Sequence, residues 1–271
     1  MRRGLASSRE QARVVVSAGR VLVGGAPAVK PSRLVAPGEA VVVLGPPPRF
    51  VSRGGEKLAA ALDRFGLDVT GRRALDAGAS TGGFTDCLLQ RGAARVTAVD
   101  VGHGQLHERL RADPRVTVVE RTDIRRFALD PPADLVVADL SFISLASVAE
   151  SLLGANAGAN ADVVVLVKPQ FEAGRAEASR GRGVIREPAV WHRVLEDTRS
   201  ALEGHGAAMM GAMVSPLTGA AGNVEFLAHL RAHAGRGHMP PLDLGALVDA
   251  VAGTGASDAD TADAAVSTGA D

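Results

Sequence analysis

Between residues 73 and 229 the sequence repeats one arrangement, in which a short run rich in valine and alanine precedes a segment long enough for a helix. These runs lack the alternation of polar and apolar residues that marks a strand with one solvated face. The pattern is typical of a parallel sheet that is covered by helices on both faces. The expected strands are 73–77, 95–100, 116–120, 133–139, 162–168, 207–214 and 223–229.

The segments between these strands complete the expected architecture. Only residues 215–222 separate the last two strands, which predicts an antiparallel pair at one end of the sheet. Helices or short crossovers are expected at 81–91, 105–111 and 144–155, and another helix is expected to begin near Gly55. The fold class is therefore α/β, with a Rossmann-like, mostly parallel sheet and an antiparallel last strand.

The first 45 residues follow a different pattern. A helix is expected over 8–18, ended by Gly19, and short β-like runs follow at 20–23 and 40–44. These elements predict a small α+β domain over residues 1–45.

Composition divides the rest of the chain. Three consecutive prolines mark a stiff linker over 46–52, so the larger domain is expected over 53–240. Residues 241–271 hold six aspartates and no basic side chain, and alanine, glycine, threonine, serine and aspartate dominate from residue 253 onward. We therefore expect an acidic, disordered tail at 241–271.

Charge is unevenly distributed along the chain. Thirty basic and thirty acidic side chains cancel overall, yet residues 1–73 hold thirteen basic side chains against five acidic ones. Few aromatic residues accompany this charge, which favours recognition of the phosphates and shape of a folded RNA over stacking on single strands. A merely solvated basic face is the alternative. The candidate RNA-binding residues are Arg2, Arg3, Arg9, Arg13, Arg20, Lys30 and Arg33.

Several features are absent from the sequence. The single cysteine, Cys87, excludes an intrachain disulfide framework and a multi-cysteine metal site, and it fits a reducing cytosol. No apolar run approaches the roughly 20 residues that cross a bilayer, and no signal peptide follows the basic N-terminus. His103 with His107, and His229 with His233, have a spacing that can hold a metal, but no third ligand is evident. We expect a cytoplasmic protein with no transmembrane insertion and no metal site, in which these histidines lie on the surface.

A glycine-rich turn lies between the first strand of the expected sheet and the helix that follows. Such a turn lets a ligand approach the backbone closely, beside the free donors of a helix N-terminus. Asp76, two residues before the first glycine, suits a ligand that carries an ammonium group and would repel a pyrophosphate. The spacing G-x-x-x-G-G also differs from the dinucleotide fingerprint G-x-G-x-x-G.

Two acids after the next strands extend this site. Asp100 ends the second strand, where a carboxylate can accept both ribose hydroxyls, and Asp123 follows the third, where it can contact adenine or serve as an N-cap. Asp76 as a helix cap and Asp100 as a turn residue are the alternatives. The pattern favours S-adenosylmethionine as cofactor. The candidate cofactor-binding residues are Asp76, Gly78, Ser80, Thr81, Gly82, Gly83, Phe84, Asp100 and Asp123.

Four ionisable residues are expected at the edge where the parallel strands end, the edge at which such sheets bind ligands. Asp139 and Lys168 end the fourth and fifth strands. Glu225 lies near the start of the antiparallel last strand, and Lys57 lies on the helix before the first. Only three lysines occur beside 27 arginines, and two of them are in this set.

These four residues suit methyl transfer to a ribose hydroxyl. The hydroxyl is a very weak acid, and a desolvated lysine can accept its proton whereas an arginine cannot. We assign Lys168 as the base or the hydroxyl-orienting group, while Lys57 would raise the local positive potential. Asp139 and Glu225 would hold the two lysines in place. Ordinary salt bridges at a sheet edge are the alternative.

Five phrases of the sequence resemble a known family. They are VSRGGEKL at 51–58, LDAGASTGGF at 75–84, VVADLSFIS at 136–144, LVKPQFE at 166–172 and GNVEF at 222–226. Together with the lysine and carboxylate set, they resemble the FtsJ-like ribose 2′-O-methyltransferases. Among these, they are similar to the TlyA family of ribosomal RNA cytidine 2′-O-methyltransferases, some of which are named haemolysins. The resemblance covers about residues 3–230 and implies a class I methyltransferase fold.

The N-terminal domain resembles the small alpha-L RNA-binding domain of a ribosomal protein, tyrosyl-tRNA synthetases and pseudouridine synthases. The phrases RRGLASSREQAR at 2–13, AGRVLVGG at 18–25 and VKPSRLV at 29–35 carry this resemblance. Met1 falls inside what is normally the first helix of that domain, so we expect either a misassigned start codon or a shortened domain. Gly24 and His103 stand where the family usually has Asn and Tyr.

The resemblance implies 2′-O-methylation of cytidine in ribosomal RNA, with ribosomal RNA or ribosomal subunits and not DNA as the partner. A non-catalytic RNA-binding or assembly factor, a membrane-lytic protein and a nicotinamide dehydrogenase are the alternatives, and Asp76 disfavours the last. The segment 174–186 carries four arginines among glycines and is either an unstructured loop or an RNA contact.

Overall fold

The computed structural model describes residues 3, 5–6, 9–46, 48–233 and 242–263. Its N-terminal part is a small α+β domain, as expected. Helix α1 (Arg9–Ser17) precedes a three-stranded antiparallel sheet in the order β2-β1-β3. The strands are β1 (Val21–Val23), β2 (Ala26–Pro27) and β3 (Val41–Val43). Val21, Val23 and Ala28 form a core of its own for this domain.

A seven-stranded sheet forms the larger domain, and its strand order is β6-β5-β4-β7-β8-β10-β9. The first five strands of this order are parallel, whereas β10 runs antiparallel to both β8 and β9. The expected Rossmann-like fold with an antiparallel last strand is thereby confirmed. The strands are β4 (Arg73–Ala77), β5 (Arg95–Val99), β6 (Val116–Val119), β7 (Ala133–Ala138), β8 (Ala157–Val167), β9 (Ala208–Val214) and β10 (Phe226–Arg231).

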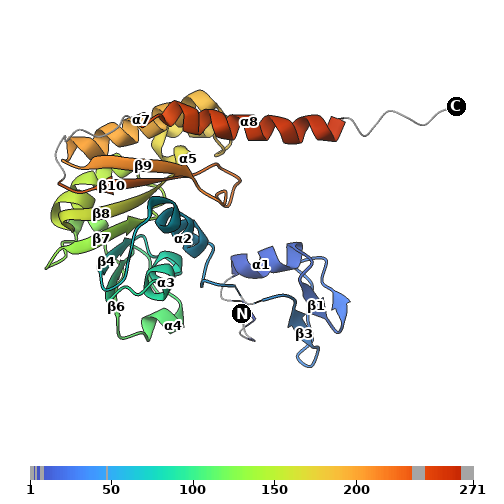
Figure 1. Ribbon diagram of the computed structural model, residues 1–271. Coiled ribbons are helices and arrows are strands. Elements are labelled where there is room, and N and C mark those ends of the chain that lie inside the picture. Colours follow the sequence, from blue (N-terminus) through green and yellow to red (C-terminus); the bar gives the residue numbers. More distant parts are fainter. Residues whose placement is uncertain (1–2, 4, 7–8, 47, 234–241, 264–271) are drawn as a thin grey trace.

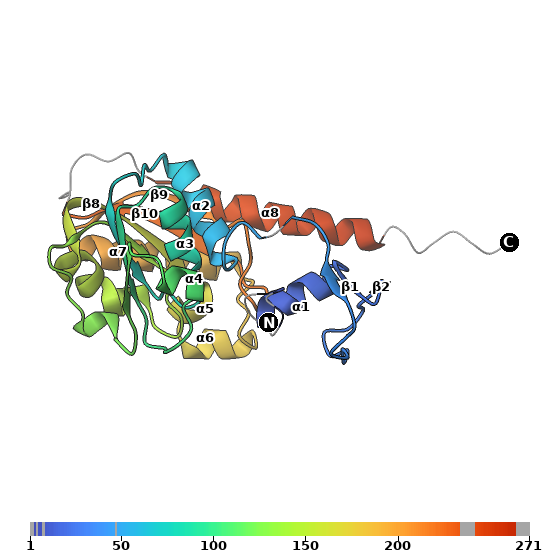
Figure 2. The same ribbon diagram turned by 90° about the horizontal axis from the view of Figure 1, so that it is seen from below.

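Helices cover both faces of this sheet because its strands are apolar on both sides. Helices α2 (Gly54–Phe65) and α3 (Gly83–Gln90) cover one face, and the long α7 (Pro188–Gly204) covers the other (Figures 1 and 2). Shorter elements connect the strands. They are α4 (Glu108–Arg111), η1 (Ile124–Arg126), η2 (Leu145–Val148), η3 (Ser151–Ala155), α5 (Pro169–Glu172) and α6 (Arg175–Arg180).

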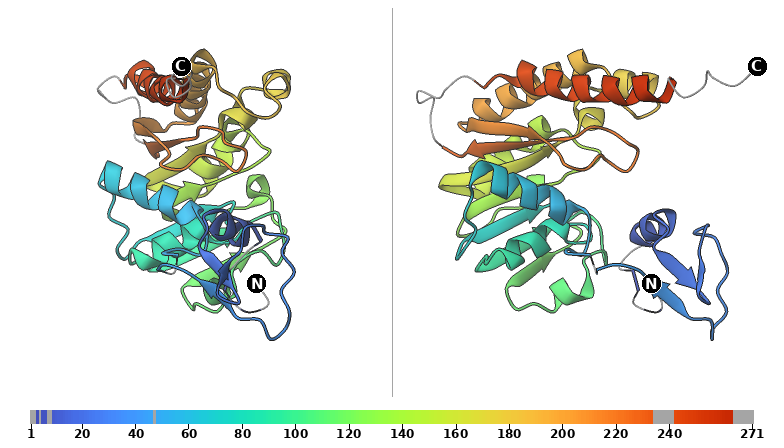
Figure 3. Two further views of the ribbon diagram at one scale, coloured as in Figure 1. Left: turned by 90° about the vertical axis from the view of Figure 1, so that its right-hand side faces the viewer. Right: turned by 45° about the vertical axis from the view of Figure 1, so that its right-hand side comes forward.

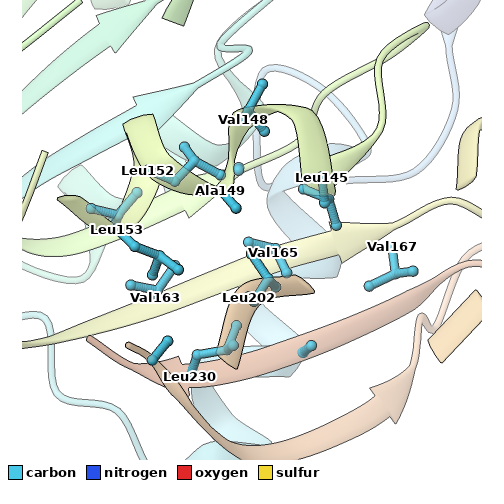
Figure 4. Close-up of a cluster of buried hydrophobic side chains, with 14 of the residues drawn as sticks. Leu145, Val148, Ala149, Leu152, Leu153, Val163, Val165, Val167, Leu202 and Leu230 are labelled. Atoms are coloured by element: carbon cyan, nitrogen blue, oxygen red, sulfur yellow. The ribbon is translucent and has the colours of Figure 1, made fainter. Parts of the chain in front are cut away.

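Alternation along β8 divides the core into two layers. Val163, Val165 and Val167 face the layer beneath α7, where they pack with η2 and η3 residues such as Leu145 and Leu152 (Figure 4). The intervening residues of β8 belong to the layer beneath α2 and α3. A strand buried on both faces reads in the sequence as a continuous apolar run, which is why the alternation was not visible there.

The small domain stands beside the edge of the sheet at which the parallel strands end (Figures 1 and 3). Arg20 fixes the exit from this domain, because its guanidinium donates to the carbonyls of Leu44, at 2.8 Å, and of Pro46, at 3.0 Å. Gly45 between them has φ of +83°, and a Cβ there would lie 2.7 Å from the Arg20 guanidinium. The chain therefore leaves the small domain in a defined direction toward α2.

The expectation of disorder across 241–271 is wrong for residues 244–263, which form helix α8 (Leu244–Asp263). The carboxylate of Asp243 accepts a hydrogen bond from the backbone N–H of Ala246 at 2.8 Å and so caps the helix. Leu244 and Val248 are buried in the core layer beneath α7, and Leu247 and Val251 pack against it. An apolar stripe with helical spacing thus outweighs the weak helix formers further along. Residues 264–271 lie outside the described part of the chain.

The docking of α8 leads to a stability prediction. We expect Leu244→Ala to lower the free energy of unfolding by about 2–4 kcal/mol, because it removes a side chain that is only 2% exposed and leaves a cavity. The exposed Asp249 of the same helix offers a control. Asp249→Ala should change the free energy of unfolding by less than about 0.5 kcal/mol. Urea unfolding of both variants measures the difference. Equal effects would show that α8 does not contribute to the folded core.

Candidate active site

The glycine-rich turn lies between β4 and α3, at the edge where the parallel strands end. Gly78 has φ of +85°, and a Cβ at this position would lie 2.6 Å from the backbone oxygen of Asp139. The turn therefore passes directly over the end of β7, which only a glycine permits. Ser80 also has positive φ, +47°, and its backbone N–H donates to Asp100 at 2.8 Å.

The later residues of the turn are fixed by packing within the protein. A Cβ on Gly82 would lie 2.3 Å from the Leu110 side chain, and one on Gly83 would lie 2.8 Å from the backbone nitrogen of Gly55. These glycines therefore allow α3 to begin in close contact with α4 and α2. Thr81 accepts a hydrogen bond at its carbonyl from the backbone of His107, and Phe84 is buried in the core layer beneath α2. The sequence analysis explained the glycines of this turn by the close approach of a ligand. At Gly82 and Gly83, the closely approaching groups are other residues of the same chain.

Asp76 lies beneath the turn and is completely buried. One carboxylate oxygen accepts a hydrogen bond from the Thr85 hydroxyl at 2.6 Å, while the other, Oδ1, has no hydrogen-bond partner among the described residues. Burial raises the pKa of this carboxyl to about 7, against the opposing effect of the Thr85 hydrogen bond. A buried acceptor without a donor is costly, so the site fits a cationic or hydrogen-bond-donating ligand group.

Asp100 and Asp123 take different places. Asp100 accepts from the backbone N–H groups of Ser80, at 2.8 Å, and Gly102, at 2.6 Å, and it lines a small pocket beside the turn with Leu106 and Val118. Each of its oxygens retains a lone pair for a further donor. Asp123 is the N-cap of η1 and pairs with Arg125, which lowers its pKa to about 2. The N-cap alternative therefore describes Asp123, and its contact with adenine stays a prediction.

Strand register brings three of the four expected catalytic residues to one edge and one face of the sheet. Phe226 of β10 pairs with Val167 of β8, so the next pair along the two strands is Glu225 and Lys168. Successive side chains of a strand alternate between its faces. Two positions further into each strand lie Val137, Leu166 and Leu227, and all three belong to the layer beneath α2. Asp139, Lys168 and Glu225 therefore point to this same face.

Two lysine–carboxylate ion pairs result on this face. Lys57 of α2 contacts Glu225, and their side chains are 10% and 3% exposed. The ammonium of Lys168 lies 2.6 Å from Asp139 and donates to the Ser141 hydroxyl at 3.0 Å. The structure thus brings all four residues to one site, and it selects which lysine pairs with which acid.

Two residues that were not predicted as site residues hold the loop after β7. Ser141 is one, through its contact with Lys168. Glu172 of α5 is the other, because both of its carboxylate oxygens accept from the backbone N–H of Leu145, at 3.0 and 3.2 Å. Burial raises the pKa of Glu172 to about 7. Both residues lie within the family phrases at 136–144 and 166–172, but only the contacts in the folded chain show what each of them holds.

Phe142, next to Ser141, is an unusual residue in this loop. Its side chain is 90% exposed and its φ is +65°, a backbone conformation that is unfavourable for residues other than glycine. Its ring centroid lies 5.0 Å from that of Phe171, which follows Lys168 on α5. An aromatic face is therefore held open to solvent beside the lysine.

The basic residues of the small domain are only partly available to a ligand. The Arg3 guanidinium donates to the carbonyls of Ala36, at 2.9 Å, and Pro37, at 2.8 Å, while Arg20 holds the domain exit and Arg33 pairs with Glu39 at 3.0 Å. Arg13 and Lys30 are exposed. Arg2 and the Arg9 side chain lie outside the described residues.

A larger cavity, of about 500 Å³, opens at the opposite edge of the sheet. Asp162 lies in it and pairs with Arg72, Arg231 and His229, at 2.5, 3.1 and 2.8 Å. Its basic groups are thus already engaged within the protein, and it lies far along the strands from the glycine-rich turn. His229, which was expected on the surface, is buried here because Asp162 provides a partner for its ring nitrogen.

Comparison with family models also divides the chain into a small N-terminal domain and a larger sheet domain. Residues 50–232 match the FtsJ-like methyltransferase model, and residues 2–41 match the S4 domain model. The first match includes the glycine-rich turn and all four residues of the two ion pairs.

Known proteins also resemble the chain over most of its length. The "16S/23S rRNA (cytidine-2′-O)-methyltransferase TlyA" of Mycobacterium tuberculosis is 51% identical, with 87% of this chain and 89% of the relative covered. "Hemolysin A" of Brachyspira hyodysenteriae is 38% identical over 83% of this chain and 95% of the relative. A solved structure from Streptococcus thermophilus, described under a hemolysin name, superposes with a TM-score of 0.76 at 37% identity, covering 96% of this chain and 95% of that one. Within the described residues, no helix combines the length and apolar character needed to cross a membrane.

Burial of Asp76 leads to a prediction about pH. Its pKa rises from 3.8 to about 7 on folding, so its contribution to stability is lost as pH increases from about 4 to 7. Asp76→Asn carries no charge at this position. We therefore expect its free energy of unfolding to increase relative to that of the unsubstituted protein between pH 4 and 7, and the difference to stay constant above pH 7. Thermal unfolding of the ligand-free proteins at successive pH values measures this difference. Exposed Asp249→Asn is the control, and a pH-independent difference for Asp76→Asn would contradict the prediction.

Proposed function

The chain belongs to the FtsJ-like methyltransferase family and carries an S4 domain, and we propose that it methylates the ribose 2′-hydroxyl of a cytidine in ribosomal RNA. The observation that carries this proposal is the pair of lysine–carboxylate contacts, Lys57–Glu225 and Lys168–Asp139, beside the glycine-rich turn. Family membership supports a methyltransferase, and these side chains support an oxygen atom as the methyl acceptor.

S-adenosylmethionine, when bound, supplies a methyl group on a positively charged sulfur. Asp76 and Asp100 are the residues that would hold it, since Asp76 has an acceptor oxygen without a partner and Asp100 lines the pocket beside the turn. The apolar side chains of Leu106 and Val118 in that pocket suit a nucleoside base. Gly78 brings the turn against Asp139, so the cofactor loop and the catalytic edge are one continuous surface.

Lys168 is placed to orient the acceptor hydroxyl. A lysine ammonium has three N–H donors, and Asp139 and Ser141 lie within reach of two of them. The third is left for a substrate oxygen. Orientation of the hydroxyl toward the methyl group is the largest contribution that such a site can make, since alignment of two reactants lowers the entropic part of the barrier.

Lys57 of α2 and Glu225, which directly precedes β10, support this arrangement from beside Lys168. Their pair is almost completely buried, so removal of either partner would leave an uncompensated charge in the interior. Because Glu225 neutralises Lys57, the pair itself adds no net charge, and the potential that attracts RNA phosphates comes from unpaired basic residues. The exposed ring of Phe142 offers a stacking face for the base of the target nucleotide.

Ribosomal RNA as substrate is supported by the S4 domain and by the name of the mycobacterial relative, and cytidine by that name alone. The exposed Arg13 and Lys30 of the small domain are available for RNA phosphates. Such a substrate would place the protein in the cytoplasm.

Incubation of the purified protein with methyl-labelled S-adenosylmethionine and ribosomal subunits tests the proposal. We expect label in ribosomal RNA, and mapping of 2′-O-methyl groups should locate it on cytidine. RNA binding without transfer would instead indicate a non-catalytic assembly factor. Leakage of liposomes without transfer would favour the lytic activity that the hemolysin names suggest.

Substitution of the catalytic lysine gives a sharper prediction. We expect Lys168→Arg to retain cofactor binding and to lose turnover by at least about a hundredfold, because a guanidinium cannot occupy the same position between Asp139 and Ser141 or accept a proton. Calorimetry of cofactor binding and single-turnover transfer assays measure the two effects. Arg95→Lys, on an exposed residue at the opposite edge, is the control. Normal transfer by Lys168→Arg would refute the assigned role.

A further inference from the structure

Three exposed arginines lie at the end of α6 and in the segment that joins it to α7, after the part of the chain that carries Lys168. They are Arg180, Arg182 and Arg186, here called the arginine turn. All three side chains are exposed. Gly181 and Gly183 separate them, so the composition alone is that of an unstructured loop. The contacts of its backbone show otherwise.

A buried asparagine anchors the backbone of the arginine turn. Asn223, which is 2% exposed, accepts a hydrogen bond from the backbone N–H of Ile185 at 2.9 Å and donates to the carbonyl of Gly183 at 2.8 Å. The Trp191 indole donates to the carbonyl of Ile185 at 3.2 Å, and the Ile185 side chain is buried in the core. The backbone between Arg182 and Arg186 is therefore held at three points.

The same asparagine places the arginine turn at the catalytic edge. Asn223 lies two residues before Glu225, which pairs with Lys57. The Asn223 carbonyl also accepts from the backbone of Gly219, and a Cβ on Gly219 would lie 2.6 Å from the Glu225 carboxylate. Figure 2 shows α6, which leads into the turn, on the side of the sheet edge from which the small domain extends. The turn and the site of methyl transfer thus share one anchoring segment.

Arg182 adopts a conformation that its residue type disfavours. Its φ is +51°, in the left-handed region, where a residue with a Cβ costs roughly 1 kcal/mol or more relative to glycine. Glycines stand on both sides of it, yet the strained position itself is occupied by an exposed arginine. Strain of this kind at an exposed charged residue is a feature of functional positions.

Among the described residues, the arginine turn forms no ion pair, in contrast to several other arginines of the protein. Arginines such as Arg72, Arg91 and Arg193 form ion pairs with aspartate or glutamate. Within the described part of the chain, no carboxylate forms an ion pair with the side chain of Arg180, Arg182 or Arg186. Their guanidinium donors are therefore available to an external anion.

We propose that the arginine turn binds the phosphates of the substrate RNA strand beside the target nucleotide. The inference rests on the proposed RNA methylation and adds a contact surface to it. A rigid, unpaired row of guanidinium groups beside the site suits phosphates, because such contacts fix the register of a strand without reading its bases. The small domain would then hold a more distant part of the same RNA.

The double variant Arg182→Gln/Arg186→Gln tests this surface. We expect KM for RNA to rise by about five- to tenfold with little change in kcat, and the salt dependence of RNA binding to fall by about one unit of slope per arginine. Cofactor affinity should not change. The matched control is Arg64→Gln/Arg95→Gln, which removes two exposed arginines at the opposite edge of the sheet. Equal effects of the two double variants would overturn the proposal, because net charge alone would then explain them.

A single substitution separates binding from stability. Arg182→Gly relieves the left-handed strain, so we expect an unchanged or higher melting temperature together with weaker RNA binding and a smaller salt slope. Arg182→Lys should restore most of the slope. Unchanged RNA binding by Arg182→Gly would refute the surface. Because binding and salt slope are measured without turnover, failure of this surface can be distinguished from failure of the proposed methylation, which would appear as absence of transfer by the unsubstituted protein.

Discussion

A charged side chain can be buried at the edge of this sheet only if its counter-charge arrives from another part of the chain. Lys57 comes from α2, the helix before the sheet. Glu225 directly precedes β10, the antiparallel strand that comes last in the sequence. Because removal from water costs each ion several kcal/mol, this pair requires that α2 and β10 be correctly placed at the same time. The contact therefore joins the first helix and the last strand of the sheet domain. The Lys168–Asp139 pair lies beside it, because Lys168 is the strand neighbour of Glu225.

Close backbone packing gives the second half of the site. Gly78 lies over the end of β7, and Gly83 lies against the start of α2, so the glycine-rich turn touches two of the four elements that carry the proposed catalytic residues. A side chain at either position would push these elements apart. The glycines that suggest a ligand-binding loop thus also keep the cofactor and the ion pairs within one surface. Among the described residues, Asp76 beneath them has a carboxylate oxygen without a hydrogen-bond partner, which is consistent with its proposed contact with the cofactor.

Charge is distributed so that the basic surfaces lie near this edge although the chain as a whole is neutral. The small domain extends from the edge at which the strands end (Figures 1 and 3), and the arginine turn is anchored at the same edge by Asn223. At the opposite edge, Arg72 and Arg231 are paired with Asp162. The exposed arginines beside the two lysine–carboxylate pairs therefore suit an RNA strand.

The order of the elements, the glycine turn and the four ionisable residues at strand ends could be predicted from the sequence, because apolar runs, glycine spacing and residue types are local properties. The sequence also contained the stripe of α8 from Leu244 to Val251, although its low-complexity composition pointed to disorder. Three findings required the folded chain: Lys57 pairs with Glu225 and Lys168 with Asp139, Glu172 and Asn223 hold the neighbouring loops, and Phe84 is buried in the core. These facts depend on which distant segments meet, and no local spacing encodes a partner that lies 27 to 168 residues away.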